Sequence, residues 1–273
     1  MKLSFSTVGC PDWTFDEIFA AAKDLGYDAI EIRGMGKEIH APSLNIFGES
    51  NIGATMQKLK NANLDISMFA SNAVIGFPDS AEAGKKEAFE YIDLANKTGV
   101  KFVRILISPR PESDDADINA AAVSYSEICE YAKNKGVTPL VETNGIFAES
   151  KVLAEFMQKI SVPDENKGVL WDINHPCRYF GETAKQTFEN IGGYVKYLHI
   201  KDSVINPETK KIEYRMPGHG DLPVYDILKL MQSINYNGVL SLEWTKRWQP
   251  ELQEPGIVFS YYVNYMKYLI REL

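Results

Sequence analysis

The chain has 273 residues, of which 45% are hydrophobic and 24% charged, and its formal net charge is −8. This balance is typical of a globular protein with a sizeable core. The negative charge argues against a nucleic-acid backbone as the main partner. No apolar run approaches the roughly 20 residues that span a bilayer, so no membrane partner is expected.

Three cysteines, Cys10, Cys129 and Cys177, form no CxxC pattern. An odd number of unevenly spaced cysteines suits reduced thiols better than a disulfide framework. The first residues, MKLSFSTVGCPDW, contain no apolar stretch of signal-peptide length. We therefore expect a cytoplasmic protein.

Eight short runs, most of them apolar and rich in β-branched or aromatic residues, predict buried strands. In chain order the predicted strands are 3–8, 28–33, 64–70, 101–107, 137–142, 168–173, 195–201 and 238–244. Several of them follow a glycine of the kind that ends a helix: Gly26, Gly99, Gly136 and Gly238.

Helical periodicity lies between these runs. In the first segment Phe15, Ile18 and Ala22 fall on one helical face, and Thr14 or Asp12 is available as the N-cap. The other predicted helical segments are 81–98, 116–135, 149–160, 182–191, 223–235 and 255–271.

Alternating strands and helices predict a parallel sheet, and the length suits one eight-stranded α/β barrel. No linker or low-complexity stretch divides the chain, so we expect residues 1–273 to form a single (β/α)8 TIM-barrel domain. An open doubly wound sheet is the alternative, which the lack of a GxGxxG or GxxxxGK[ST] phosphate loop disfavours. Long loops at 34–50 and 202–222 are expected at the C-terminal face of the barrel.

Four potential metal ligands end four successive predicted strands: Glu142 in PLVETN, Asp172 in VLWDIN, His199 in YLHIKD and Glu243 in LSLEW. Neighbouring strands lie about 4.8 Å apart, so these side chains can converge on one ion. Three carboxylates and one imidazole suit Mn²⁺, Co²⁺, Mg²⁺ or Zn²⁺. Any one of them alone is as readily a helix cap or a surface charge. Three buried carboxylates without a cation would repel one another, which favours a metal site.

Polar residues beside these strand ends are candidates for substrate contacts. His175 in WDINHP is either a loop histidine fixed by Pro176, a substrate hydrogen-bond donor or a second-metal ligand. Lys201 in HIKD either neutralises a developing oxyanion or pairs with a carboxylate. Asp202, which follows it, either orients His199 or has a structural role, and the structural role is favoured.

Three further residues are candidates with structural alternatives. Trp13, after the first strand, either stacks on a sugar or packs beneath its loop. Arg33, at the end of the second strand, binds a substrate carboxylate or closes an ion pair at the rim. His219 lies in the long loop 202–222, where it contacts substrate or is solvated.

The ordered set VETNG, WDINHP, HIKD and SLEW resembles the sugar isomerase/epimerase superfamily, whose members have a xylose isomerase-like TIM barrel, over essentially the whole chain. The segment GHGDLP at 218–223 is similar to a glycine-punctuated loop of that family. The resemblance implies one divalent metal ion bound by the four strand-end residues.

The same resemblance implies roles for individual side chains. Glu142 and Glu243 would also move protons on opposite faces of the substrate, and His175 would contact substrate oxygens. Family members carry an arginine shortly after the histidine-bearing strand, but here the residues 203–205 are Ser-Val-Ile. Arg215, further along the loop, is the remaining candidate for that substrate contact.

The chemistry permits three outcomes from one intermediate. Chelation of a carbonyl and an adjacent hydroxyl acidifies the α C–H and stabilises an enediolate. One glutamate removes the proton, and the other returns it to the opposite face in epimerisation or to the neighbouring carbon in isomerisation. The sequence therefore predicts a sugar or polyol isomerase/epimerase, with a keto-polyol (inosose-type) dehydratase as the alternative.

A DNA repair enzyme similar to endonuclease IV is less favoured. That activity needs additional histidines after strands two to four, and none follows the third or fourth strand here. The acidic charge also fits poorly with duplex DNA. The expected partner is a small-molecule sugar, keto-sugar or polyol, and a homo-oligomer is left open by the aromatic residues near the C-terminus.

Overall fold

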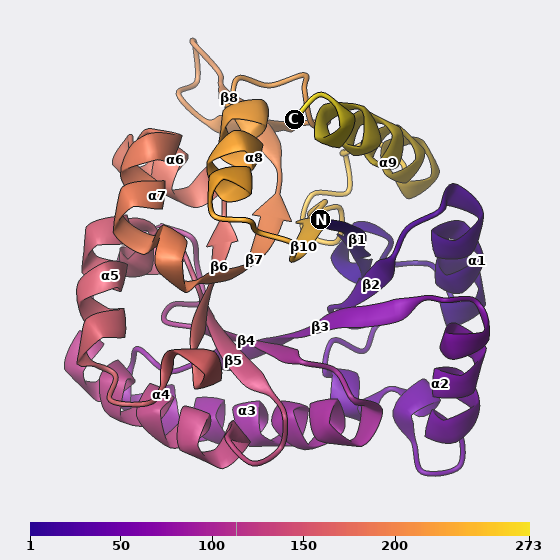
Figure 1. Cartoon of the computed structure of the whole chain (residues 1–273), viewed down its shortest axis with the longest axis horizontal. Coiled ribbons are helices and arrows are strands. Elements are labelled where there is room, and N and C mark those ends of the chain that lie inside the picture. The colour runs from indigo at the N-terminus through magenta and orange to yellow at the C-terminus, as the bar shows by residue number, and fades with distance from the viewer. Residues whose placement is uncertain (113) are drawn as a thin grey trace.

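The computed structural model describes residues 1–112 and 114–273. Eight parallel strands close into a barrel in the order β1-β10-β7-β6-β5-β4-β3-β2, with helices around the outside (Figure 1). The barrel strands are β1 (Lys2–Ser6), β2 (Ala29–Ile32), β3 (Asp65–Val74), β4 (Phe102–Leu106), β5 (Thr138–Glu142), β6 (Gly168–Asp172), β7 (Val195–Ile200) and β10 (Val239–Leu242). All eight predicted strands are confirmed, and closure of the sheet excludes the doubly wound alternative.

The helices that cover the barrel are α1 (Phe15–Leu25), α2 (Ile52–Asn61), α3 (Pro78–Thr98), α4 (Ile118–Ala132), α5 (Ser150–Lys159), α6 (Asn174–Phe180), α7 (Ala184–Ile191), α8 (Val224–Ser233) and α9 (Pro255–Arg271). The seven predicted helical segments are confirmed, whereas α2 and α6 were not predicted. The α2 sequence, IGATMQKLKN, contains few apolar residues, and α6 is only two turns long, so periodicity is weak in both.

Local signals explain where the first helix begins and ends. Thr14 caps α1 and forms a capping box with Glu17, which satisfies backbone N–H groups of the first turn. Thr14, and not Asp12, is therefore the N-cap. At the other end Gly26 has a φ of 74°, a left-handed conformation that other residues rarely adopt.

The barrel interior changes from apolar to polar along its axis. Toward the N-terminal ends of the strands, the interior is filled by a separate cluster of buried side chains: Met68, Ala70, Leu140, Leu170, Tyr197 and Val239. The main core lies outside the barrel, between strands and helices. Toward the C-terminal strand ends, the inward positions become charged: Arg104 pairs in register with Leu140, and His199 lies beside Asp172 and Ser241. This polar layer is where the predicted site falls.

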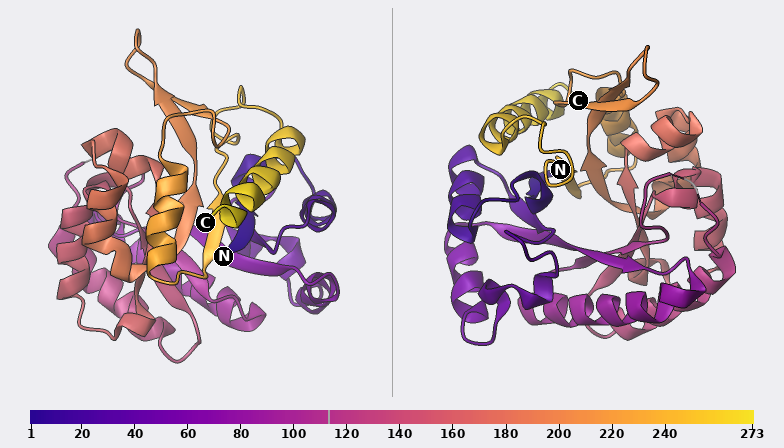
Figure 2. Two further views of the ribbon diagram at one scale, coloured as in Figure 1. Left: turned by 45° about the horizontal axis from the view of Figure 1, so that its top comes forward. Right: turned by 180° about the vertical axis from the view of Figure 1, so that it is seen from behind.

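The segment 202–222, predicted as a loop, contains an antiparallel hairpin of β8 (Asp202–Ile205) and β9 (Ile212–Arg215). It extends away from the barrel (Figure 2). The segment 34–50 is confirmed as a loop with two short 3-10 turns. No helix among the described residues is both long and apolar enough to cross a bilayer.

Candidate metal centre

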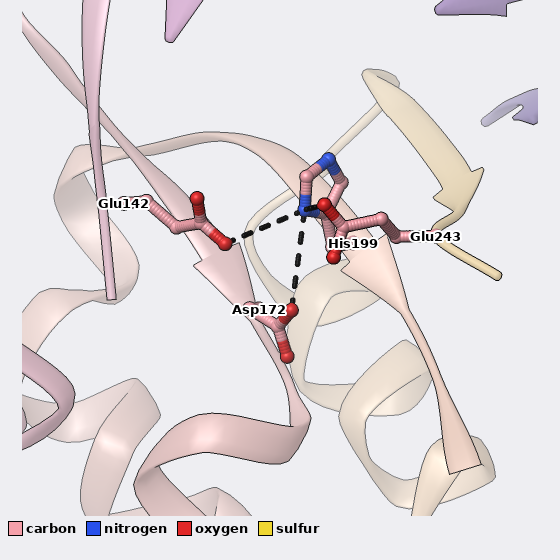
Figure 3. Close-up of side chains that lie close together, drawn as sticks. All are labelled: Glu142, Asp172, His199 and Glu243. Atoms are coloured by element: carbon pink, nitrogen blue, oxygen red, sulfur yellow. Dashed lines mark ion pairs between the residues drawn. The ribbon is translucent and has the colours of Figure 1, made fainter. Parts of the chain in front are cut away.

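Four side chains converge at the C-terminal ends of β5, β6, β7 and β10. Glu142, Asp172, His199 and Glu243 are all buried, and each offers a ligand atom within 4.8 Å of the other three (Figure 3). Glu142 and Asp172 end their strands, His199 is the second-last residue of β7, and Glu243 follows β10 directly. Figure 3 shows Glu142 and Glu243 entering from opposite sides of the gap between them.

The ring of His199 is oriented by the carboxylate of Glu31, which contacts the ring nitrogen that points away from the cluster. Its Nε2 lies 3.0 Å from Glu31 Oε2, which also accepts a hydrogen bond of 3.0 Å from the Tyr197 hydroxyl. An ionised carboxylate can only accept, so Nε2 carries a proton and Nδ1 faces the cluster. Nδ1 is 3.6 Å from Glu142 Oε1 and from Glu243 Oε1, and 4.0 Å from Asp172 Oδ2.

This arrangement fits a divalent cation. His199 Nδ1 is buried without a hydrogen-bond partner and points at three carboxylate oxygens. Burial opposes a charged imidazole, but Glu31 and Glu243 raise the pKa of His199 well above its ordinary value. In the metal-free protein, Nδ1 therefore carries a proton. A metal ion would replace that proton, because only the deprotonated nitrogen can bind a metal. One imidazole nitrogen and three carboxylate oxygens are ligands for Zn²⁺, Mn²⁺ or Mg²⁺.

Arg104, from the middle of β4, joins the two glutamates. Its Nη1 lies 3.1 Å from Glu142 Oε2 and 3.4 Å from Glu243 Oε1. Burial alone would raise the pKa of Glu142, but Arg104 and the neighbouring His199 outweigh it and lower that pKa to about 2. The pKa of Glu243 is lowered well below its ordinary value, where Lys201 and His199 outweigh burial. Both glutamates are thus ionised at neutral pH and can accept a proton.

Lys201 and His175 lie beside the cluster. Lys201 Nζ lies 2.6 Å from Asp172 Oδ2 and forms an ion pair with Glu243. His175 Nδ1 lies 2.9 Å from the Thr143 carbonyl, which only accepts, so Nδ1 donates and Nε2 is left to face the site. His175 Nε2 is 3.6 Å from Asp172 Oδ2.

A pocket of about 430 Å³ opens onto the cluster. This volume suits one small molecule. Its walls are Val8, Arg33, Asn72, Arg104, Leu106, Pro109, Pro111, Glu142, Asn144, His175, Lys201, Tyr214, Glu243, Thr245, Trp248 and Gln249. The substrate-contact predictions for Arg33, His175 and Lys201 therefore fall on residues of the pocket wall.

Three other predicted contacts do not line this pocket. Trp13 packs its ring edge-on against Phe259, with centroids 5.7 Å apart. His219 is exposed and lies against Tyr261, and Arg215 is exposed on β9, where it pairs with Glu213. The hairpin carries Arg215 outward, and its neighbour Tyr214 lines the pocket instead.

Asp202 does not orient His199. Its carboxylate accepts hydrogen bonds from the backbone N–H groups of Ser203, Gly218, Gly220 and Leu222. A Cβ at Gly220 would lie 2.1 Å from Asp202 Oδ1, so glycine is required there. Asp202 thus has the structural role of holding the GHGDLP loop, and it is Glu31 that contacts the ring of His199.

Arg104 and Trp248 are among the site residues that were not predicted from the sequence. Arg104 is a charged residue inside an apolar strand, FVRILI, and that position was the available signal. Trp248 lies in the loop after β10, is 57% exposed and lines the pocket.

A larger cavity, of about 750 Å³, lies at the opposite, N-terminal ends of the strands, among residues such as Lys2, Asp65 and Val239. It contains none of the four clustered ligands. Barrel enzymes carry their chemistry at the C-terminal face, so the smaller pocket is the candidate site.

Comparisons with known proteins agree with this geometry. Residues 19–258 match the family described as xylose isomerase-like TIM barrel. Fructoselysine 3-epimerase of Escherichia coli O157:H7 is 24% identical over 253 residues, which cover 89% of this chain and 90% of the relative.

Solved structures share the fold. The probable 3-DHS dehydratase AsbF of Bacillus anthracis aligns with a TM-score of 0.79 at 16% identity, over 98% of this chain and 99% of its own. The IOLI protein, solved with a zinc atom, aligns with a TM-score of 0.79 at 17% identity, over 97% of this chain and 96% of its own. The family match spans most of the barrel, so the chain belongs to the xylose isomerase-like TIM barrel family.

Proposed function

We propose that this protein is a divalent-metal-dependent isomerase or epimerase of a sugar or polyol, with Glu142 and Glu243 as the two proton carriers. The observation that carries the proposal is the pair of buried, ionised glutamates on opposite sides of one metal-ligand cluster, at the base of a small-molecule pocket. The relation to fructoselysine 3-epimerase supports the reaction class.

Glu142, Asp172, His199 and Glu243 would hold the metal ion, with Glu31 fixing the ring of His199 from behind. When bound, the ion would polarise a substrate carbonyl and an adjacent hydroxyl and so favour an enediolate. A protein of the same fold was solved with a zinc atom, which agrees with the proposal of a divalent ion.

Proton transfer is the task of the glutamates. One carboxylate removes the proton from the carbon beside the carbonyl, and the other protonates the opposite face or the neighbouring carbon. Arg104 contacts both carboxylates, so it keeps each of them ionised until the substrate is in place. His175 Nε2 and the Asn144 side-chain oxygen, which has no hydrogen-bond partner, face substrate hydroxyls in the pocket.

Dehydration is the second candidate reaction. The ammonium group of Lys201 pairs with both Asp172 and Glu243, which places an acid beside a proton-accepting carboxylate. Such an acid can protonate a departing β-hydroxyl after the α C–H is broken. The fold similarity to a probable dehydratase agrees with this alternative.

The test is product analysis by ¹H and ¹³C NMR in D₂O, with metal-loaded protein and a panel of ketoses, inososes and hydroxypyruvate. Deuterium at a stereocentre or at a neighbouring carbon supports the proposed proton transfer. Loss of water from the substrate identifies the dehydratase instead. If no substrate exchanges a carbon-bound proton or loses water, both candidate reactions are wrong.

A further inference from the structure

Arg33 is the cation of the pocket wall that lacks an anionic partner. It follows β2 directly, is 6% exposed, and lines the pocket together with Glu142 and Glu243. Its backbone N–H donates to Thr7 Oγ1 at 2.8 Å, which fixes the start of the side chain. Arg104 and Lys201 line the same pocket, but each pairs with carboxylates of the cluster.

The hydrogen bonds of Arg33 leave donors free. Its Nη2 donates to the side-chain oxygen of Asn72, a neutral acceptor, whereas Nη1 is buried without a partner. Among the residues that the structure describes, no carboxylate lies within ion-pair distance of Arg33. Burial and Arg104 lower the pKa of Arg33 to about 10, so the group stays cationic at neutral pH.

A buried cation without an anion is costly unless a ligand supplies one. The cations around the site are Arg33, Arg104 and Lys201, and the carboxylates are Glu142 and Glu243 in the pocket wall and Asp172 and Glu31 beside it. A divalent ion at the cluster would add two positive charges, so the three cations and the ion would outweigh the four carboxylates by one charge. Arg33 is the cation without an anionic partner, so it is where a negative charge of the ligand is expected.

We propose that Arg33 and Asn72 bind a carboxylate of the substrate, so that the substrate is a keto-sugar acid and not a neutral sugar. Arg33 Nη1 donates to one carboxylate oxygen, and the amide NH₂ of Asn72, whose oxygen is engaged by Arg33, donates to the other. One cation and one neutral donor match a single negative charge, which favours a carboxylate over a phosphate ester. The inference rests on the proposed function, since the glutamates at the cluster must act on the other end of the same molecule.

Three probes with the same ketose end test the charge. D-Fructose is neutral, D-fructuronate carries a carboxylate at C6, and D-fructose 6-phosphate carries a phosphate there. Isothermal titration of metal-loaded protein should give a Kd for fructuronate at least tenfold below that for fructose, and below that for the phosphate. Equal affinity for fructose and fructuronate, or tighter binding of the phosphate, would overturn the inference.

Variants separate Arg33 from the metal as the source of this preference. Arg33→Met should remove the preference for fructuronate. Asn72→Asp should do the same, because it gives Arg33 a carboxylate partner inside the protein. Arg271→Met, at an exposed arginine of α9, is the control and should keep the preference. If both Arg33→Met and Asn72→Asp still bind fructuronate more tightly than fructose, another group binds the carboxylate and the inference is wrong.

The two proposals can fail separately. Deuterium exchange in D₂O without any preference for fructuronate leaves the proposed function standing and removes the carboxylate site. A preference for fructuronate that Arg33→Met abolishes, in a protein that exchanges no carbon-bound proton, leaves the carboxylate site and removes the proposed reaction. Thermal unfolding and metal content of each variant show whether the barrel is intact.

Discussion

Replacement of Glu31 by glutamine tests whether the polar layer beneath the cluster prepares it for a metal ion. Glu31 is fully buried, and its Oε2 accepts from His199 Nε2 and from the Tyr197 hydroxyl, both at 3.0 Å. Glutamine keeps the shape but removes the charge. A hydrogen bond to a charged group contributes about 1.5–3 kcal/mol and a neutral one about 0.5–1.5 kcal/mol, so the loss is about 1.5 kcal/mol, or roughly tenfold in affinity.

Loss of the long-range attraction between Glu31 and the ion adds to that value, and carboxylates behind a histidine ligand typically contribute 10–100-fold to metal affinity. We therefore expect Glu31→Gln to bind Co²⁺ or Zn²⁺ about 10–100-fold more weakly. The assay is titration of metal-free protein against a competing chelator. Because Glu31 also raises the pKa of His199, the titration is repeated across a range of pH to separate proton competition from ligand strength.

A matched control is Glu155→Gln, at an exposed glutamate of α5, which should leave metal affinity unchanged. If Glu31→Gln binds metal within twofold of the unmodified protein, His199 is not oriented by Glu31 for ligation, and the account of the cluster is wrong.

Four more outcomes are expected. Glu142→Gln and Glu243→Gln should each lower kcat at least 100-fold at saturating metal, and full activity of either would exclude that residue as a proton carrier. Exhaustive chelation should abolish turnover, and Mn²⁺ or Co²⁺ should restore it; indifference to chelation would contradict a metal role. Arg104→Met should lower the free energy of unfolding of the metal-free protein by about 3–5 kcal/mol, measured in urea, because it leaves buried carboxylates unpaired. The loss should be smaller when metal is bound, and equal losses of unfolding free energy in the two forms would contradict this. Since the pKa of Glu142 falls from 4.5 to about 2 on folding, its ionised form stabilises the metal-free protein by about 3 kcal/mol above pH 4.5, and this stabilisation is lost as the pH falls toward 2. Glu142→Gln should flatten the dependence of unfolding free energy on pH over this range, and an unchanged dependence would refute the role of Glu142 in it.

Much of the fold could be predicted because each strand is a short apolar run with a clear end. The same ends located Glu142, Asp172, His199 and Glu243, since parallel strands bring their C-terminal ends to one face of the barrel. Residues two apart on a strand share one face, which agrees with the inward position of both Tyr197 and His199.

The parts that were missed depend on contacts between distant segments. Arg104 reads as one charge in an apolar strand, and only the closed barrel shows that it reaches glutamates on β5 and beyond β10. Glu31 contacts His199 across 168 positions of sequence. Arg215 and Tyr214 are adjacent, and the hairpin register decides which of them faces the pocket.

The central claim is that one divalent ion is held by side chains from β5, β6 and β7 and from the residue after β10. Anomalous diffraction at the manganese edge, from crystals of the protein soaked in Mn²⁺, tests it most directly. The account predicts one strong peak within about 2.0–2.4 Å of oxygens of Glu142, Asp172 and Glu243 and of His199 Nδ1. A peak elsewhere, or no peak at a concentration that saturates metal binding in solution, would contradict it.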